Sequence, residues 1–525
     1  MIESKNNTKI IFFYVIFLSF FSVLFNQYYG NLGVCPVDSF ASFNAGYDVL
    51  NNKYPFKDYW TITGPFVALV QAFLFKLFGV SWFSYILHAS IINFIFSILT
   101  FYTLYKFKLN THYCFFYSFL VSILSYPSSG SPYVDHQSAM FSIIAIYFFI
   151  LGLKTNKGVY WFLLPIILFL SFLTKQAPTG HIFIIITFLS LIFFIFNYNL
   201  KNILLGIAGS ILVVLVFIFT FVSAGIPFES FFLQYILYPL SLGENRLSFI
   251  LPLEFSQIIL RQKLIHISSV LLIIFCIKKL LKSYKNLYSK DVLIVFSLIL
   301  SAWVLIAHQL MTINGIFIFF IIPILAGFSH IYYSQELNQK KYVLHSLVVF
   351  TLVSTIYYGY KYVHQRDFMD LRNTNMKIVA DTSILSSKLK GLKWKSCLRP
   401  NDPKKEVSDI FEIIQILKEE TREKSIITDY QFISPILSEY DNSPSQVWFH
   451  YHVIPVKKSK YFKKYKKFFI EKFQENNVEV VYVIKPLLGG DKIMKNVLES
   501  NCYKKIKINE RLDKYDILDC EDLKN

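Results

Sequence analysis

Long apolar runs separated by short polar connections fill the first 360 residues, whereas residues 361–525 mix charged and apolar positions. A helix needs about 20 apolar residues to cross a bilayer, and several runs reach or approach that length. The pattern predicts membrane spans at residues 10–27, 82–105, 112–126, 134–153, 158–174, 178–196, 202–223, 264–281, 290–308, 313–332 and 341–360. We therefore expect a polytopic α-helical membrane domain of 11 to 13 helices over residues 1–360, followed by a soluble domain over residues 361–525.

The loop between the first two spans has its own pattern. From Phe40, apolar side chains recur at Phe43, Tyr47 and Leu50, which is the spacing of one helical face and predicts a short helix along the membrane surface. The apolar run 66–78 is too short to span and predicts a second surface or partly embedded helix. Asp38 stands at the start of the first helix, either as its N-cap or as a functional carboxylate, and the local pattern leaves both open.

The C-terminal part, called the tail below, reads as a small α/β domain. Helical periodicity covers residues 407–420 and 458–474, and strand patterns cover 425–428, 478–484 and 504–520. The tail contains no glycine-rich phosphate loop, nucleotide-binding fingerprint or zinc-ligand spacing. Its basic run 457–467 is either a solvated helix face or a contact for lipid head groups.

Composition supports the membrane assignment. Of 525 residues, 54% are apolar and only 16% are charged, which is more apolar surface than a soluble fold could bury. The net charge of +18 suits contact with anionic lipid, and without a nucleic-acid motif we expect no nucleic-acid partner. The basic N-terminus lacks a small-residue cleavage site near residues 28–33, so we expect a retained first helix.

The distribution of lysines predicts the orientation. Alternate connections carry the lysines, and the opposite short loops, 126–133 and 309–312, contain no Lys or Arg. This positive-inside pattern holds only if the run 66–78 does not cross the membrane. It places the N-terminus in the cytoplasm and, with an odd number of spans, the tail outside the cytoplasmic membrane. The lysines concerned are Lys106, Lys108, Lys154, Lys157, Lys201, Lys278, Lys279, Lys282, Lys285, Lys290, Lys340 and Lys341.

Four of the six cysteines fall in segments predicted to lie outside. Cys35 is in the first loop, and Cys397, Cys502 and Cys520 are in the tail. An oxidising compartment would allow two of the tail cysteines to pair, but the sequence does not say which.

Polar residues gather in the segments predicted to face outward. In chain order they are Asp38 and Asp58; Asp135 and His136; Lys175 and Gln176; Gln234, Tyr235, Glu244, Asn245, Arg246 and Arg261; and His308, Gln309 and Asn314. Such convergence of carboxylates, amides and cations on one face describes a site open to the outer leaflet.

These residue types suit the transfer of a sugar from a lipid phosphate. The reaction needs a carboxylate to take a proton from the acceptor and cations to stabilise the departing phosphate. We assign the base to Asp38, with Asp135 second, either orienting the acceptor or sharing the base role. Lys175, Arg246 and Arg261 are phosphate candidates, although each could instead contact lipid head groups.

The other polar side chains have competing interpretations. We place Asp58, His136 and Gln176 among the substrate contacts. His136 more often would be a hydrogen-bonded interface residue than a metal ligand, because no second His or Cys stands at ligand spacing. The aromatic residues Tyr54, Tyr59 and Trp60 fit an interfacial belt first and a sugar-stacking surface second.

The first loop carries a longer motif. It reads Asp-x8-Tyr-x6-Tyr-Pro-Phe-x-Asp-Tyr-Trp-x3-Gly-Pro from Asp38 to Pro65, followed by an apolar run that ends in Leu-Phe-Gly. This resembles the first loop of the C-type membrane glycosyltransferases, in the bacterial branch related to protein mannosyltransferases and to the aminoarabinose transferases of lipid A. The resemblance implies a polyprenyl-phosphate sugar donor, Asp38 as catalytic aspartate, Asp135 as the acidic residue of the second outer loop, and Lys175-Gln176 as the Lys-Gln of the third.

The chain departs from that pattern at two places. Asp38-Ser39 stands where many relatives have Asp-Glu, and Thr63-Gly64-Pro65 stands where they have Lys-Pro-Pro. The second change removes a cation from the expected phosphate pocket.

Our hypothesis from the sequence is an inverting glycosyltransferase that moves a hexose or pentose from a polyprenyl phosphate to a glycolipid, polysaccharide or protein. Because the superfamily divides on metal dependence, the resemblance also admits a divalent cation, Mg²⁺ or Mn²⁺, but no metal ligands are assigned. The alternatives are a transporter or flippase, for which repeated halves and polar residues at the bilayer midplane are expected, and a non-catalytic scaffold for the tail.

Overall fold

The structure is a computed structural model of the whole chain. It describes residues 2–34, 36–127, 130–247, 254–312, 318–336, 340–365, 371, 375–439, 442–445, 453–487 and 493–520, without the side chains of residues 2–7, 37, 244–247 and 336. Cys35 and Asn314 therefore lie outside the described residues, as do the side chains of Glu244, Asn245 and Arg246.

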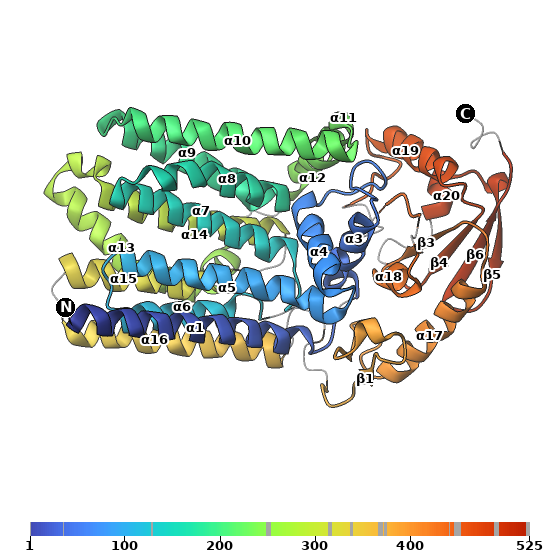
Figure 1. The fold of residues 1–525 in the computed structure, drawn as a ribbon, viewed down its shortest axis with the longest axis horizontal. Helices are drawn as coiled ribbons and strands as arrows, with labels where there is room; N and C mark the ends of the chain where they lie inside the picture. Colours follow the sequence, from blue (N-terminus) through green and yellow to red (C-terminus); the bar gives the residue numbers. More distant parts are fainter. Residues whose placement is uncertain are drawn as a thin grey trace.

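A bundle of long helices forms the first part of the chain (Figure 1). Within the described residues, one helix overlaps each predicted span: α1 Ile2–Gly30, α5 Trp82–Lys106, α6 Thr111–Leu124, α7 Val134–Thr155, α8 Gly158–Thr174, α9 Gln176–Phe196, α10 Leu200–Ala224, α13 Lys263–Lys282, α14 Lys290–Thr312, α15 Ile321–Glu336 and α16 Lys341–Gly359. Eight are long and apolar enough to cross a membrane, whereas α6, α8 and α15 have 14, 17 and 16 residues. The chain is a multi-pass membrane protein; the number of crossings and their orientation stay predictions.

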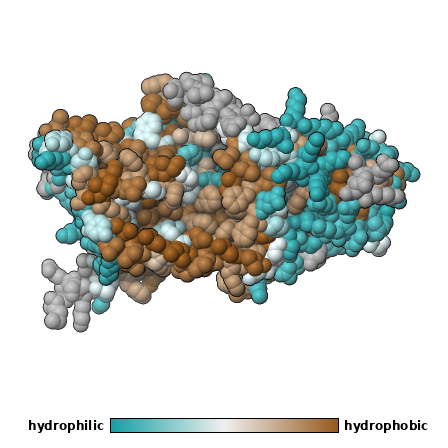
Figure 2. Space-filling model, turned by 90° about the horizontal axis from the view of Figure 1, so that it is seen from above, coloured by the Kyte–Doolittle hydropathy of each residue, from teal (hydrophilic) through white to brown (hydrophobic). Residues whose placement is uncertain are grey.

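The surface of the bundle is apolar where a bilayer would cover it. Figure 2 shows a hydrophobic belt over the bundle and a hydrophilic surface over the tail. Helix α10 exposes apolar side chains along nearly its whole length, including Phe219 and Val222, while α7 is buried on all sides. Because α7 is central, residues in its first turn are enclosed by neighbouring helices.

The tail contains a four-stranded sheet in the order β3-β4-β6-β5. Strands β3 Lys424–Thr428 and β4 Val480–Ile484 are parallel, and β6 Leu512–Ile517 pairs antiparallel with both β4 and β5 Tyr503–Lys507. The helices are α17 Pro403–Glu419, α18 Ile433–Leu437, α19 Phe462–Glu475 and α20 Ile493–Val497, with a small sheet of β1 Ala380–Asp381 and β2 Lys393–Trp394. The two parallel strands, β3 and β4, are buried at every position, as expected for strands covered on both faces. The predicted α/β character of the tail is confirmed.

Short helical turns complete the described chain. They are η3 Tyr284–Tyr288 between α13 and α14, η4 Tyr360–His364 after α16, η5 Ser387–Leu389 and η6 Ser500–Cys502. At the tail end of the bundle, α11 Phe228–Phe231, η1 Phe232–Leu237 and α12 Tyr238–Leu247 follow α10, and η2 Ser256–Leu260 precedes α13.

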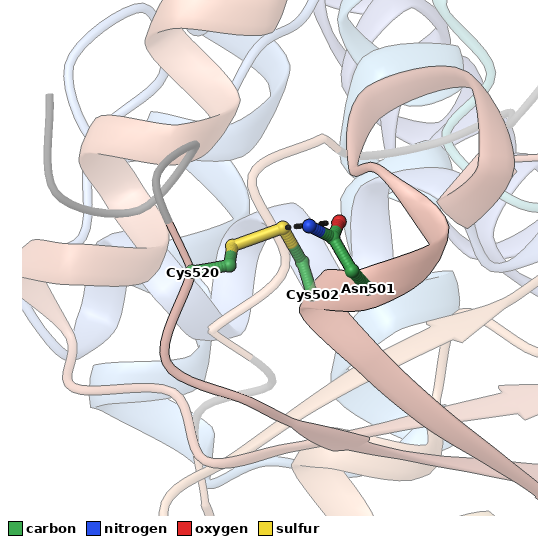
Figure 3. Close-up of a disulfide and its surroundings, with 3 residues drawn as sticks. All are labelled: Asn501, Cys502 and Cys520. Carbon is green, nitrogen blue, oxygen red and sulfur yellow. Dashed lines mark hydrogen bonds between the residues drawn. A yellow bond between two sulfur atoms is a disulfide. The ribbon is translucent and has the colours of Figure 1, made fainter.

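A disulfide joins Cys502 to Cys520 (Figure 3). It links the two ends of the β5–β6 hairpin across a sequence separation of 18 residues. Closing a loop of about this length stabilises a fold by about 3 kcal/mol through restriction of the unfolded chain. Disulfides are typical of oxidising compartments, and the placement of the tail outside the cytoplasm stays a prediction.

The first loop lies between the bundle and the tail (Figure 1). It forms α2 Pro36–Ser39, α3 Ala41–Leu50 and α4 Pro65–Phe78. The Phe40 ring lies 4.6 Å from Phe432 and 6.3 Å from Trp394, centroid to centroid, and Phe43 and Tyr47 are buried in the same core. The apolar face predicted to rest on the membrane surface is therefore covered by protein: the tail covers Phe40, and Phe75 of α4 and Tyr85 of α5 pack against Phe43.

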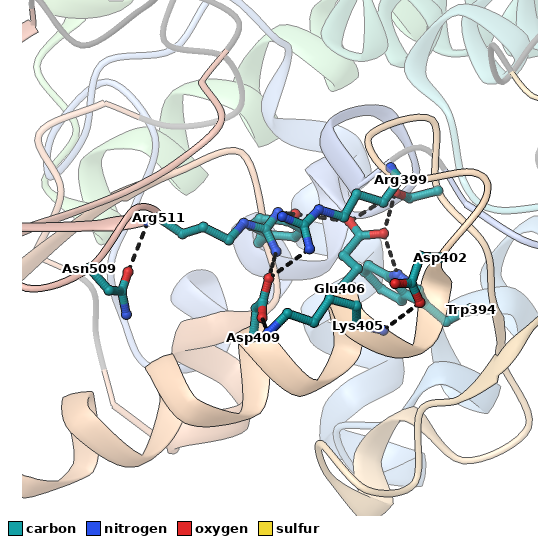
Figure 4. A network of polar contacts seen from close by, with 10 residues as sticks. Trp394, Arg399, Asp402, Lys405, Glu406, Asp409, Asn509 and Arg511 are labelled. Atoms are coloured by element: carbon teal, nitrogen blue, oxygen red, sulfur yellow. Dashed lines mark hydrogen bonds and ion pairs between the residues drawn. The ribbon is translucent and has the colours of Figure 1, made fainter.

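A buried polar network supports the part of the tail that receives Phe40 (Figure 4). The Glu406 carboxylate accepts hydrogen bonds from Trp394 Nε1 at 3.1 Å, Ser396 Oγ at 2.7 Å and Tyr430 OH at 2.9 Å. One turn later on α17, Asp409 forms ion pairs with the side chains of Arg399, Lys405 and Arg511. A buried carboxylate is stable only with such partners, so the network ties α17 to β2 and to the segment before β6.

Two acidic side chains make the stability of the tail depend on pH. Hydrogen bonds from Arg422 hold the pKa of Glu420 well below its ordinary value of 4.5, although partial burial opposes them. Burial raises the pKa of Asp513, but hydrogen bonds from Lys485 and Lys505 outweigh it and leave the pKa below its ordinary value of 3.8. Since both values are lowered in the folded state, this stabilisation is complete above about pH 5 and is lost as the pH falls through the folded values.

We expect the melting temperature of the full chain to fall more steeply below pH 4.5 in the wild type than in Glu420→Gln, which lacks the titrating carboxylate. Thermal unfolding followed by near-ultraviolet circular dichroism between pH 3 and pH 7 measures this. Glu510→Gln, at an exposed position, is the control and should follow the wild type. Equal slopes for all three proteins would contradict the assignment.

Candidate functional site

Three of the predicted outward segments meet at the tail end of the bundle. Asp135 lies in the first turn of α7, Lys175 in the joint between α8 and α9, and His308 in the last turns of α14. These helices pack against one another, which brings together residues up to 173 positions apart in the chain.

The centre of this cluster is an enclosed ion pair. Lys175 Nζ lies 2.5 Å from Asp135 Oδ1, and His308 Nε2 lies 3.6 Å from the same oxygen. Asp135 and His308 are each 2% exposed, whereas the Lys175 side chain is 23% exposed. A buried carboxylate requires a partner charge, and here that partner extends from the interior toward the surface.

The side chain of Gln176 holds backbone rather than pointing into a cavity. Its Nε2 donates to Ile62 O at 3.1 Å and to Tyr235 O at 2.6 Å. Gln234 makes a matching clamp, because its Oε1 accepts from Thr61 N at 3.0 Å and its Nε2 donates to Phe56 O at 3.2 Å. Residues 56–62 of the first loop are thus fixed against η1 and the start of α9.

Gly64 allows the first loop to approach α8 closely. Its N–H donates to Thr174 O at 3.3 Å, and a Cβ at this position would lie 1.8 Å from Leu173 O. Backbone atoms cannot move aside as a flexible side chain can, so only glycine fits here without displacing the loop.

We expect Gly64→Ala to destabilise the fold by about 1–3 kcal/mol through overpacking and to reduce any activity of the site. The melting temperature of the full chain in detergent measures the first effect. Gly180→Ala is the matched control, because a Cβ there meets nothing within 4 Å and alanine favours the helix. Equal melting temperatures for Gly64→Ala and the wild type would show that the loop shifts freely.

A small cavity lies between the first loop and α7. Its volume is about 20 Å³, and its lining includes Ala41, Ser42, Thr63, Gly64 and Val134. Ala41 follows α2, which carries Asp38, and Val134 precedes Asp135, so the cavity separates segments that carry the two predicted catalytic aspartates. It has the size of about one water molecule, far below the roughly 300–1,000 Å³ of ligand pockets.

Asp38 is half-buried in α2 and does not occupy the N-cap position of α3. The N-cap position of α3 is Phe40, whose side chain makes no capping hydrogen bond. The interpretation of Asp38 as the N-cap of the amphipathic helix is therefore wrong, because a separate turn intervenes.

The remaining predicted contacts lie in varied surroundings. Asp58 Oδ2 accepts from Tyr54 N at 2.7 Å and closes a turn within the first loop. His136 is buried, with its ring centroid 5.0 Å from that of Tyr126. Arg261 is exposed and donates to Gln257 Oε1 at 3.3 Å. The side chain of Arg246 lies outside the described residues.

Trp60 serves the tail interface rather than a membrane belt. It is fully buried, its backbone N–H donates to Pro444 O at 2.7 Å, and its ring lies 5.3 Å from the ring of Tyr465 on α19. The prediction that Trp60 belongs to an interfacial aromatic belt is wrong, since the tail covers it.

One residue of the cluster and one that holds the first loop were not given a role from the sequence. His308 and Gln234 stood among the polar residues of outward segments, but nothing in the sequence pairs His308 with Asp135 or Gln234 with residues 56–61. Their positions in turns predicted to face one side were the only available signal.

Within the described ranges, no three His, Cys, Asp or Glu side chains come together as a metal site. Asp135 itself fits a divalent cation poorly, because the ammonium of Lys175 already lies against its carboxylate. We derive no step through a metal.

Comparisons with known proteins give little more. No protein-family model matches the chain, and no curated protein matches it. Two solved structures of the Archaeoglobus fulgidus oligosaccharyltransferase are similar in part. The complex with zinc and sulfate is 15% identical, covers 89% of this chain and 68% of its own, and has a TM-score of 0.44. The structure tethered to an acceptor peptide containing the NVT sequon is 12% identical to this chain. The match covers 90% of this chain and 69% of that protein, with a TM-score of 0.40. At these values the likeness carries no argument about function.

Proposed function

We propose that this protein is an inverting glycosyltransferase that moves a monosaccharide from a polyprenyl-phosphate carrier to an acceptor at the tail side of the membrane. The observation that carries the proposal is the enclosed Asp135–Lys175 pair at one end of the bundle, beside the first loop with Asp38. The resemblance of that loop to C-type membrane glycosyltransferases supports the choice of reaction.

The proposed roles follow from what each side chain can do. Asp38 takes the proton from the acceptor hydroxyl or amine while the acceptor atom attacks the anomeric carbon. The bond from that carbon to the phosphate oxygen breaks, and the polyprenyl phosphate leaves with the bonding electrons. Attack opposite the leaving group inverts the anomeric configuration.

Lys175 is the best-placed cation for the departing phosphate. Its ammonium is anchored by Asp135 and its side chain remains partly exposed, so it is oriented before the phosphate charge develops. Asp135 is then a positioning residue rather than the base, because its nearer oxygen already contacts Lys175 at 2.5 Å. His308 completes the enclosure of that carboxylate.

The donor is a lipid-linked sugar, and the acceptor is a glycolipid, a cell-surface polysaccharide or a protein. The membrane is the cytoplasmic membrane, with the N-terminus inside and the tail outside. The flippase or transporter alternative is less favoured, because the charged pair lies in the first turn of α7 and not at its middle.

The test is transfer of radiolabel from a panel of polyprenyl-phosphate monosaccharides in membranes that contain the full chain. We expect labelled product with at least one donor, of opposite anomeric configuration, and none with the matching nucleotide sugars. The same membranes as sealed vesicles report movement of the donor across the bilayer. Movement without transfer would overturn the proposal in favour of a flippase.

A further inference from the structure

One helix at the tail end of the bundle exposes apolar side chains. Residues 228–247, built from α11, η1 and α12 and called the interfacial helix below, follow α10 directly. Its opposite face buries Phe231, Tyr235 and Tyr238 against protein. An exposed apolar face beside the end of a membrane helix is the pattern of a helix in the lipid interface. The exposed residues are Phe228, Phe232, Leu237 and Leu240, whose exposed fractions are 39%, 55%, 45% and 64%.

Helix α19 of the tail lies beside the interfacial helix (Figure 1). The ring of Tyr461, just before α19, lies 5.9 Å from that of Tyr238, and Lys464 Nζ lies 3.9 Å from Glu229 Oε1. The buried ring of Trp60 contacts both Tyr238 and Tyr465. These contacts fix the start of α19 at the level of the interfacial helix. The exposed apolar face of that helix favours a position among lipid head groups.

The start of α19 is strongly basic. Tyr465, Phe469 and Phe473 face the core of the tail, and Lys463, Lys464 and Lys467 are exposed on the other side of the helix. Lys464 and Lys467 are 59% and 79% exposed. The ion pair of Lys464 with Glu229 joins two exposed groups and contributes little. The run 457–467, called the lysine patch below, contains no acidic residue; its lysines are Lys457, Lys458, Lys460, Lys463, Lys464, Lys466 and Lys467.

We propose that the lysine patch binds the phosphate-bearing head groups of anionic lipids in the leaflet on the tail side of the membrane. Seven neighbouring cations repel one another, and an anionic surface at the same level relieves that repulsion. Each lysine near such a surface favours binding by roughly fivefold. The contact holds the tail over the end of the bundle through α19, and it does not depend on the proposed reaction.

The experiment uses the full chain in nanodiscs of zwitterionic lipid, with or without phosphatidylglycerol. We expect anionic lipid to raise the melting temperature of the wild type, because it binds the folded tail. The increase should be smaller by roughly half or more in the triple variant Lys463→Gln, Lys464→Gln, Lys467→Gln, and high salt should remove the difference. In zwitterionic nanodiscs the variant should have the same melting temperature as the wild type, which would show that the variant folds.

The matched control removes the same charge elsewhere in the tail. Lys418→Gln, Lys504→Gln, Lys507→Gln changes three exposed lysines on α17 and β5 and should keep the full increase. The proposal would be overturned if the lysine-patch variant kept the full increase in melting temperature with anionic lipid. It would also be overturned if the control variant lost as much of that increase as the lysine-patch variant. An equal increase from inorganic phosphate in zwitterionic nanodiscs would also overturn it, in favour of a site for free anions.

Discussion

Asp38→Asn should reduce sugar transfer by about 10²- to 10⁴-fold, the range expected for loss of a general base. Asparagine keeps the size and hydrogen-bonding capacity of the side chain but does not accept the proton. Because asparagine is isosteric with aspartate and Asp38 lies outside the N-cap position of α3, the substitution should leave the melting temperature close to that of the wild type. Transfer of radiolabel from the active polyprenyl-phosphate sugar, at matched protein amounts, measures the effect.

The control for this prediction is Asp291→Asn. Asp291 lies in the first turn of α14, at the end of that helix opposite His308, and its loss should leave transfer unchanged. Wild-type activity of Asp38→Asn would remove this carboxylate from the mechanism. A loss of both activity and folding would instead indicate a structural role for Asp38.

Breaking the buried ion pair should have the second large effect. Lys175→Met should destabilise the fold by about 3 kcal/mol, because it leaves Asp135 charged and 2% exposed. Asp135→Asn should cost less, since Lys175 is already 23% exposed and can turn to water. The double variant should be less destabilised than the sum of the two single variants. Unfolding free energies in mixed micelles of detergent and SDS provide the double-mutant cycle.

Lys263→Met is the control for the loss of a lysine, because Lys263 is exposed at the start of α13. Additive single effects in the cycle would contradict a coupled pair. If Lys175 also stabilises the departing phosphate, Lys175→Met should lower the rate of transfer at saturating donor. Asp135→Asn should lower it less, because the ammonium remains.

The helices of the bundle were largely predictable, because a span through lipid has a simple signature. Each backbone polar group must be satisfied within the segment, so length and apolarity suffice to locate a helix. The predicted segments coincide with the described bundle helices, and the run 66–78 is the helix α4. The strands β3 and β4 were predictable for a related reason, since both are short and rich in β-branched residues.

The surroundings of the first loop were not predictable in the same way. The periodic spacing of Phe40, Phe43 and Tyr47 predicts that this face is buried. It does not predict whether lipid or protein covers the face, because both are apolar. The structure shows that Phe40 packs against Trp394 and Phe432, more than 350 residues away, whereas Phe43 packs against Phe75 of α4 and Tyr85 of α5. Trp60 was misassigned for the same reason.

The sequence by itself determined the membrane class of this protein, the location of its helices and the α/β character of its tail, because those depend on local length, period and composition. The tertiary structure alone decided that Lys175 pairs with Asp135, that Gln176 and Gln234 hold the first loop, and that Cys502 pairs with Cys520. Ion pairs, clamps and disulfides depend on distances between segments far apart in the chain. Those distances are set by the packing of whole helices and are not encoded in any single window of sequence.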